Sequence, residues 1–328
     1  MSEIFEPALA DEKLLEKLRQ DPALKAAYGA VPAGYTRLTA PRFDVERVWK
    51  LIDGAVDTHI HPGTDAYNAR VYDELEIAIQ ACNAGMKAVV YKAHSMPSGR
   101  SAYFVQKAAD EWAARNNRKK IDVRGGVMLN DAVGGLNPEA VLTSYRIGAK
   151  HVWLPNKDSS FHHKLYGMPG GIEMLDGDGH ILTKLREILA LVAEGDMVLS
   201  LSHQSVKERF VIIEEARKMG VKRIEVGHPL AIMAKMTVEQ MKTAAEMGAY
   251  LGMYPANFES LVWSWEAFME TVRVVGPDHI VVGTDCGHFA FPTPLEALRL
   301  FITGMLTRGI PDRDVEKMVK TNAMKLLY

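Results

Sequence analysis

The sequence is poor in cysteine, in long apolar runs and in net charge. Its 328 residues include two cysteines, Cys82 and Cys286, too few for a disulfide framework or a cysteine-rich zinc site. No uninterrupted apolar run approaches the ~20 residues that a membrane-spanning helix needs, and the acidic start MSEIFEPALADEKLLEKL lacks the apolar core of a secretory signal. A formal net charge of -2 offers no general attraction to nucleic acid or to an anionic membrane. We therefore expect a cytoplasmic protein that binds neither nucleic acid nor membranes.

After Gly54 the sequence alternates short apolar runs, rich in β-branched residues, with helical patterns. Such alternation is typical of a parallel sheet that is buried on both faces. Eight units favour a closed (β/α)8 TIM barrel over an open doubly wound sheet, and no G-x-G-x-x-G follows the first run to suggest dinucleotide binding. The eight apolar runs span residues 55–61, 87–94, 121–129, 150–155, 196–203, 222–228, 248–254 and 279–285.

The first part of the chain has a different pattern. DEKLLEKLRQDPALKAAYG carries leucines at helical spacing, and FDVERVWKLIDG predicts a second short helix that ends at Gly54. We expect an N-terminal helical extension over residues 1–50, packed on a barrel that spans residues 51–328. A barrel of this kind is often part of a homo-oligomer, and we expect one here.

Histidines gather at the ends of the apolar runs. Of the 11 histidines in the chain, five close a run: His59, His61, His94, His203 and His228. Asp285 closes the eighth run in the same way. The carboxyl ends of the strands of a (β/α)8 barrel carry the active site, and residues i and i+2 of a strand point to the same side. A single strand-end histidine is more often a hydrogen-bonded core residue, but this combination favours a metal centre.

The same motifs resemble those of the amidohydrolase superfamily. The resemblance covers about residues 50–328 and rests on VDTHIHPG, LSHQS, VGHP, VGTDCGH and a closing VKTNAMKLLY. The segments KAHSMPSGRSA, GGVMLNDAVGGLNPEAV and HVWLPNKDSS are similar to those of a poorly characterised branch of metal-dependent hydrolases. The resemblance implies that His59, His61, His203, His228 and Asp285 bind a divalent metal, with Asp285 also moving protons. Zinc suits this ligand set best, and manganese or iron are alternatives.

One position departs from the family pattern. Many members with two metals bridge them by a carboxylated lysine or a glutamate on the fourth strand, where this sequence has Trp153. Lys92 at the end of the second run has the right parity to act as the bridge, with Lys157 as the second choice. Alternatively, Lys92 anchors a substrate carboxylate or phosphate, or pairs with Asp57. Without a bridge, the site holds one metal.

Further polar and aromatic residues at strand ends are candidates for substrate binding. Residues 157–171 form a long segment after the fourth run that suits a lid, in which we expect His162 and His163 to face solvent. The candidates for substrate contact are His94, Asn130, Trp153, Lys157 and Tyr254.

The expected reaction is hydrolysis of an amide, cyclic amide or lactone-type ester bond in a small organic molecule. A metal-activated water would attack, Asp285 would shuttle its proton, and His228 would help to stabilise the oxyanion. Two alternatives stay open within the superfamily: a mononuclear decarboxylase or hydratase, and a phosphoester hydrolase. A barrel that binds a metal or ligand without turnover is the alternative of another class.

Overall fold

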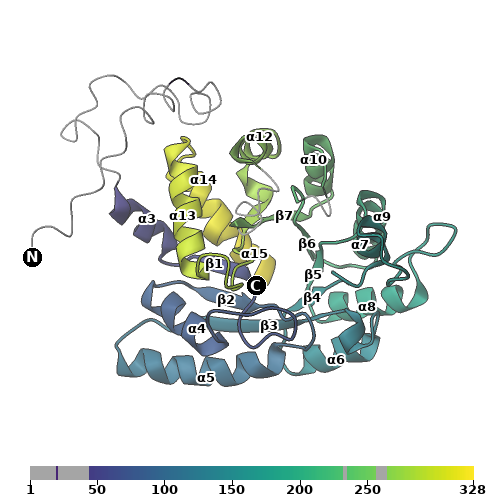
Figure 1. Ribbon diagram of the computed structural model, residues 1–328, viewed down its shortest axis with the longest axis horizontal. Coiled ribbons are helices and arrows are strands. Elements are labelled where there is room, and N and C mark those ends of the chain that lie inside the picture. Colours follow the sequence, from purple (N-terminus) through teal and green to yellow (C-terminus); the bar gives the residue numbers. More distant parts are fainter. Residues whose placement is uncertain (1–19, 21–43, 232–234, 256–263) are drawn as a thin grey trace, which may run out of the picture. The chain divides into compact units, whose positions relative to one another are not determined.

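The computed structural model describes residue 20 and residues 44–231, 235–255 and 264–328 (Figure 1). The chain divides into two compact units, Met1–Val45 and Glu46–Tyr328. The expected extension over residues 1–50 therefore lies largely outside the described residues. Its last part is the helix α3 (Val45–Ile52), which confirms the short helix expected before Gly54. Among the described helices, none combines the length and apolarity that crossing a membrane requires.

Eight parallel strands form one sheet in sequential order, from β1 to β8. All eight apolar runs of the sequence become strands, which confirms the predicted (β/α)8 barrel. Most of the histidines and Asp285 lie just beyond the last residue of their strand. The strands are β1 (Val56–Ile60), β2 (Ala88–Tyr91), β3 (Asp122–Met128), β4 (His151–Trp153), β5 (Val198–Leu201), β6 (Arg223–Gly227), β7 (Tyr250–Met253) and β8 (Ile280–Val282).

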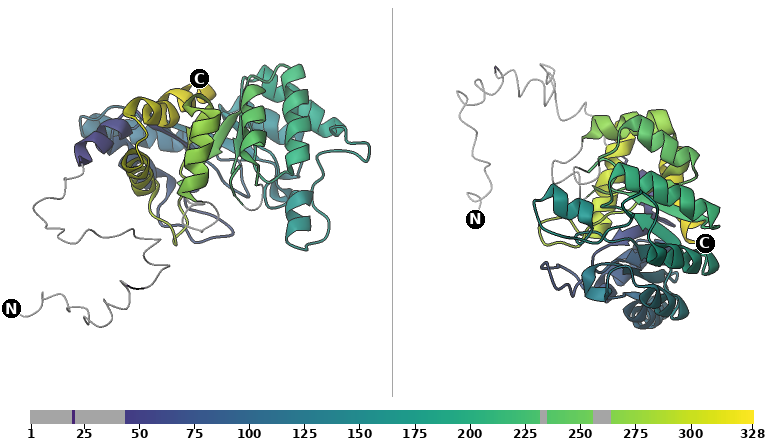
Figure 2. Two further views of the ribbon diagram at one scale, coloured as in Figure 1. Left: turned by 90° about the horizontal axis from the view of Figure 1, so that it is seen from above. Right: turned by 90° about the vertical axis from the view of Figure 1, so that its right-hand side faces the viewer.

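Helices surround the strands on the outside, as Figure 1 and the two further views of Figure 2 show. Capping boxes begin three of them: α4 after Asp73, α9 after Ser205 and α10 after Thr237. In each, the cap side chain and the residue three positions on bond each other's backbone N–H groups. The longer helices are α4 (Glu74–Asn83), α5 (Gly99–Arg115), α6 (Pro138–Arg146), α8 (Thr183–Glu194), α9 (Val206–Lys218), α10 (Val238–Glu246), α12 (Trp265–Val275) and α13 (Pro294–Thr307).

Shorter helical segments complete the described chain. The segment after β4 contains a short helix, so the long loop expected there is partly ordered by hydrogen bonds of its own. These segments are α7 (Ser160–Leu165), α14 (Asp312–Glu316), α15 (Asn322–Leu327), the 3-10 turns η1 (Asp131–Val133) and η3 (Pro277–His279), and the π-turn η4 (Lys317–Thr321).

The strands are buried on both faces, and alternate residues divide between two cores. In β5, for example, Val198 packs inside the barrel, whereas Leu199 packs outward against the helices. The same alternation places Ala88 and Val90 of β2 inside. Lys92 continues that inward row, since side chains of a strand repeat their direction every second residue.

The C-terminal helix α15 fills the base of the barrel. Its side chains Ala323, Leu326 and Leu327 join the interior cluster of Val56, Val281 and their neighbours. Asn322 holds the helix in place, because its side-chain amide donates to the carbonyls of Pro277 and Ile280, each at 2.7 Å. The closing motif of the sequence therefore seals the end of the barrel opposite the strand-end histidines.

We expect Leu326→Ala to lower the free energy of unfolding by about 2–5 kcal/mol, because it opens a cavity among fully buried interior side chains. Urea denaturation followed by circular dichroism measures the change. Lys325→Ala removes an exposed side chain of the same helix and is the matched control. Equal losses in the two variants would contradict the sealing role of α15.

Candidate metal centre

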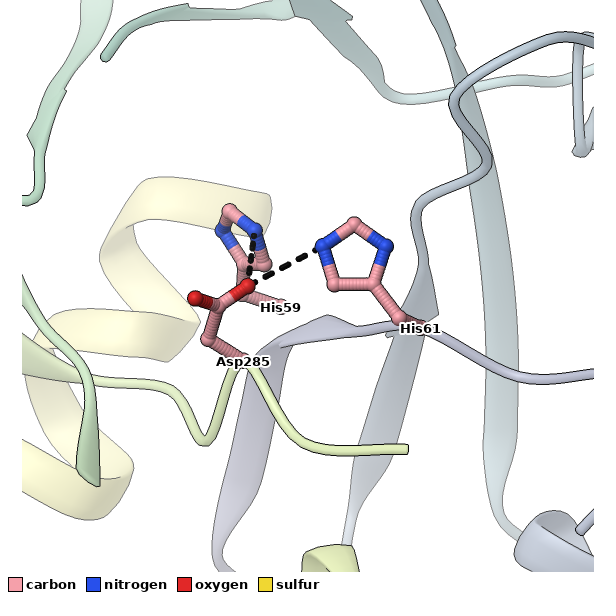
Figure 3. A group of neighbouring side chains, drawn as sticks. All are labelled: His59, His61 and Asp285. Carbon is pink, nitrogen blue, oxygen red and sulfur yellow. Dashed lines mark ion pairs between the residues drawn. The ribbon is translucent and has the colours of Figure 1, made fainter. Parts of the chain in front are cut away.

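His59 and His61 bring two imidazoles to the same side of β1. His59 is fully buried, and His61 is 5 % exposed at the end of the strand. Their Nε2 atoms lie 3.2 and 3.0 Å from one oxygen of Asp285, as Figure 3 shows. The expectation that alternate residues of this strand face one point is therefore met, and the three side chains form a group that could hold a metal ion.

Backbone contacts between the end of β8 and the end of β1 place Asp285. The Asp285 N–H donates to the carbonyl of His59 at 2.7 Å, and the His61 N–H donates to the carbonyl of Cys286 at 2.9 Å. The chain then passes so close to β1 that a Cβ atom on Gly287 would lie 1.8 Å from the His61 carbonyl oxygen. Only glycine fits this crossing, where φ is +131°.

A buried carboxylate beneath these residues reinforces the junction. Asp57 accepts hydrogen bonds from the N–H groups of His59 (3.1 Å) and Thr284 (2.9 Å), and from the Thr284 hydroxyl (2.6 Å). Burial raises the pKa of Asp57 to about 7, and the bonds from Thr284 oppose that shift. Asp57 thus ties β1 to β8, which disagrees with the alternative that it pairs with Lys92.

His203 and His228 approach from the neighbouring strands. The ring of His228 lies 5.7 Å from that of His59 and 5.5 Å from that of His203, centre to centre. The Nδ1 atom of His228 is 3.9 Å from Asp285. The five side chains expected to form the metal centre therefore gather at one end of the barrel.

The fully buried Arg209 of α9 holds the two strand ends that carry His203 and His228. Its guanidinium donates to the carbonyl of Ser202, one residue before His203, and at 3.3 Å to the carbonyl of Gly227, one residue before His228. Sequence analysis missed this residue, although it lies at helical spacing from the buried Ile212, Ile213 and Ala216. An arginine on the apolar face of a predicted helix indicates a buried charge that needs hydrogen-bond partners, and this pattern could have identified it.

Two of the candidate ligands have a strained backbone. His228 and Asp285 have φ angles of +56° and +55°, in a region that residues with a side chain rarely adopt. Such strain concentrates at functional sites, where the surrounding structure must hold it in place. Here the Asp285 backbone is held by its bond to His59 and the His228 strand end by Arg209.

The electrostatics of the group favour unprotonated ligand atoms. Burial lowers the pKa of His59 to about 3 and that of His228 to about 4. It also lowers the pKa values of His61 and His203 well below the usual range. Burial acts to raise the pKa of Asp285, but the nearby His228 and His59 outweigh it and hold that pKa well below its ordinary value.

Lys92 lies at the floor of the group. Its Nζ atom is 3.0 Å from Nε2 of His59 and 5.8 Å from the centre of the Trp153 ring. Burial lowers the pKa of Lys92 to about 8. The side chain of Lys92 therefore points into the barrel, as its position along the strand predicted. Its amine lies beside the His59 nitrogen that also faces Asp285.

Aromatic side chains support the histidines from inside the barrel. The ring of Tyr254 lies 4.4 Å from that of His59, and its hydroxyl donates to Glu225 at 2.9 Å. Trp153 is fully buried, stacked on His151 at 4.8 Å. Both were expected to contact substrate, but their positions beneath His59 favour a supporting role. The sequence pattern did not single out Glu225, a fully buried carboxylate of β6 that also accepts from the Ser200 hydroxyl.

Two candidates at the ends of β2 and β3 differ in how they are bonded. The Asn130 amide donates to the carbonyl of His94 at 3.2 Å and accepts from the Asn156 N–H at 2.9 Å, so it connects neighbouring strand ends. His94 stacks on His61 at 4.5 Å, and its Nδ1 lies 3.3 Å from Asp65.

Asp65, another residue that sequence analysis missed, completes a second histidine–carboxylate group with His61 and His94. One of its oxygens binds Arg70 at 2.8 Å as well as His94, and the other accepts from the N–H groups of Tyr67 and Asn68. Both oxygens of the Asp65 carboxylate therefore already have hydrogen-bond partners within the protein. We interpret Asp65 as a residue that positions His94.

The segment after β4 reaches the group through α7. His162 was expected to face solvent, but its Nδ1 lies 2.9 Å from Nδ1 of His203, and the expectation is wrong for this residue. His163 instead contacts the carbonyl of Pro169. Lys157 at the start of the segment is exposed and lies over the ring of Tyr67, 5.6 Å from its centre.

Because Arg209 satisfies two buried carbonyls, we expect Arg209→Met to lower the free energy of unfolding by at least about 2 kcal/mol. Lys207→Met, an exposed position on the same helix, is the control and should change stability by less than about 0.5 kcal/mol. Chemical denaturation measures both. A stable Arg209→Met variant would show that the two strand ends do not need the guanidinium.

The chain is similar to known proteins in sequence and in fold. A family model described as "Family of unknown function (DUF6282)" matches residues 54–252. No curated protein matches the sequence. A solved amidohydrolase from Pseudomonas aeruginosa is similar with a TM-score of 0.57 and 16% identity, covering 85% of this chain and 98% of that one.

Two further solved structures are similar over comparable lengths. A probable dipeptidase PvdM from Pseudomonas aeruginosa has a TM-score of 0.58 and 12% identity, covering 86% of this chain and 97% of that one. A mutant PTE-like lactonase from Deinococcus radiodurans has a TM-score of 0.52 and 16% identity, covering 84% and 96%. At these identities the likeness shows the fold alone, the (β/α)8 barrel that the resemblance to the amidohydrolase superfamily implied. Since the family model matches more than half of the sequence, the chain belongs to the family of unknown function DUF6282.

Proposed function

We propose that this protein is a metal-dependent hydrolase that cleaves an amide, cyclic amide or lactone-type ester bond in a small organic molecule. The observation that carries the proposal is the meeting of four imidazoles and one carboxylate at the carboxyl ends of β1, β5, β6 and β8. At its centre, His59 and His61 direct Nε2 at one oxygen of Asp285. This is the end of the barrel at which enzymes of this fold place their active sites.

The donor set fits a divalent metal. Metal ligands must be unprotonated, and the lowered pKa values of the four histidines and of Asp285 leave them so at neutral pH. Imidazole nitrogen with a single carboxylate suits zinc first, and manganese or iron as alternatives. We assign His59, His61, His203, His228 and Asp285 as the ligands.

The chemistry divides between the metal and the side chains. When bound, such a metal makes water acidic enough to react near neutral pH and polarises a carbonyl group. The carboxylate of Asp285 takes the proton of the attacking water and returns it to the leaving nitrogen or oxygen. His228, whose Nδ1 lies 3.9 Å from the other oxygen of Asp285, helps to stabilise the developing oxyanion. Burial of the group excludes bulk water, which strengthens these interactions.

Lys92 is assigned as the bridge between two metals, if two are held. Its amine lies 3.0 Å from His59 Nε2, and burial lowers its pKa, so a larger fraction is unprotonated than for an exposed lysine. Carboxylation of a lysine requires the unprotonated amine. Lys157 is the less suitable choice, because it is exposed and lies over Tyr67 rather than beside a candidate ligand.

Metal content tests the proposal directly. We expect one to two metals per chain, measured by plasma mass spectrometry on protein purified without added metal or chelator. In Lys92→Ala a fall from about two to one supports the bridge, and Lys164→Ala, an exposed lysine of α7, is the matched control.

About one metal in both Lys92→Ala and the parent protein would remove the bridging role and favour mononuclear chemistry such as decarboxylation. No metal in either protein, even after reconstitution with zinc or manganese, would falsify the assignment of the metal centre.

Asp285→Asn tests the catalytic part. We expect kcat/KM on any amide or lactone that the parent protein hydrolyses to fall by roughly 10²–10⁴-fold, because the amide side chain cannot take up the proton. Thermal unfolding checks that the variant is folded. Undiminished activity in folded, metal-loaded Asp285→Asn would instead favour a barrel whose chemistry does not use this carboxylate.

A further inference from the structure

We propose that the substrate carries a carboxylate, which Lys157 binds at the mouth of the site. The inference rests on the proposed function and deepens it, since it names the class of small molecule. It depends on the position of Lys157, on the residues between it and the candidate ligands, and on the charges around it.

Lys157 is joined to the metal centre by a row of aromatic rings. Its Nζ atom lies 5.6 Å from the centre of the Tyr67 ring. That ring meets His94 edge to face at 6.3 Å, and His94 stacks on His61 at 4.5 Å with an angle of 4° between the planes. A small molecule that reaches from Asp285 toward solvent along this row meets the ammonium group of Lys157.

The row is held rigidly from behind. Asp65 binds the N–H of Tyr67 at 2.8 Å and Nδ1 of His94 at 3.3 Å, and it is itself fixed by Arg70 at 2.8 Å. One carboxylate therefore positions the Tyr67 backbone and the His94 ring, the two residues between Lys157 and His61.

Lys157 is an exposed cation at the start of the segment after β4. Lys157 makes no ion pair within the described part of the chain. The adjacent carboxylate of Asp158 accepts from the Asp131 N–H at 2.8 Å, and that of Asp65 is engaged by Arg70. An unpaired cation with this reach attracts an anionic ligand.

A carboxylate fits better than a phosphate. A phosphate group presents three strong acceptor oxygens and is usually met by an arginine fork or several backbone N–H groups. Near Lys157, Arg70 is occupied by Asp65, and Asn68 and Tyr67 donate their N–H groups to the same carboxylate. One ammonium group suits an ion with one charge and two oxygens.

The test compares two probes that the protein cannot hydrolyse. 4-Oxopentanoate carries a carbonyl group and a carboxylate, whereas pentan-2-one keeps the carbonyl group and has a methyl group in place of the carboxylate. Binding to the zinc-loaded, full-length protein is measured by calorimetry. We expect 4-oxopentanoate to bind at least 10-fold more tightly than pentan-2-one, and Lys157→Gln to remove most of this preference while leaving binding of pentan-2-one within about twofold.

Two control variants sharpen the result. Lys157→Arg keeps the charge and should keep the preference, and Lys164→Gln removes an exposed lysine of the neighbouring helix and should change nothing. Equal binding of the two probes, an unchanged preference in Lys157→Gln, or no binding of 4-oxopentanoate would each overturn the proposal. Metal content of the same samples separates the two failures: full metal without the preference removes only the carboxylate assignment, whereas no metal removes the proposed function.

Discussion

The meeting of the first and last strands is the constraint on which the rest of the structure depends. Asp57 holds Thr284 by two hydrogen bonds, and backbone bonds join His59 to Asp285 and His61 to Cys286. The carboxylate of Asp285 reaches the two β1 imidazoles only because these bonds fix its left-handed backbone. Arg209 does the corresponding work for His203 and His228. The candidate ligands are therefore placed by buried hydrogen bonds to the main chain.

The strands and most helices were predictable because each carries a local signal. Eight apolar runs gave eight strands, and glycines at 85, 148, 220 and 248 end helices with φ between +76° and +89°. The parity of residues within β1 and β2 correctly predicted that His59, His61 and Lys92 share a direction. These features depend on neighbours within a few residues, which a sequence displays directly.

The supporting residues were less visible, because their partners are distant in sequence. Asp57 acts on Thr284, Asp65 on His94, and Glu225 on Tyr254. Each is a charged residue in or beside a buried segment. Such a position indicates that another group must compensate the charge, but it does not identify that group. For the same reason Trp153, Tyr254 and Asn130 were expected at the substrate, whereas the structure places them beneath or between the strand ends. The contact between His162 and His203 could not be predicted, because it depends on where α7 lies in space.

The junction of β1 and β8 also governs the order of events during synthesis of the chain. His59 and His61 leave the ribosome early, but their partner Asp285 follows more than two hundred residues later, and the base of the barrel closes only with α15. Until then the two imidazoles have no fixed carboxylate to share an ion with, and the nascent barrel has an open edge between its first strand and solvent. The complete set of candidate ligands is therefore present only after the end of β8 has joined the end of β1.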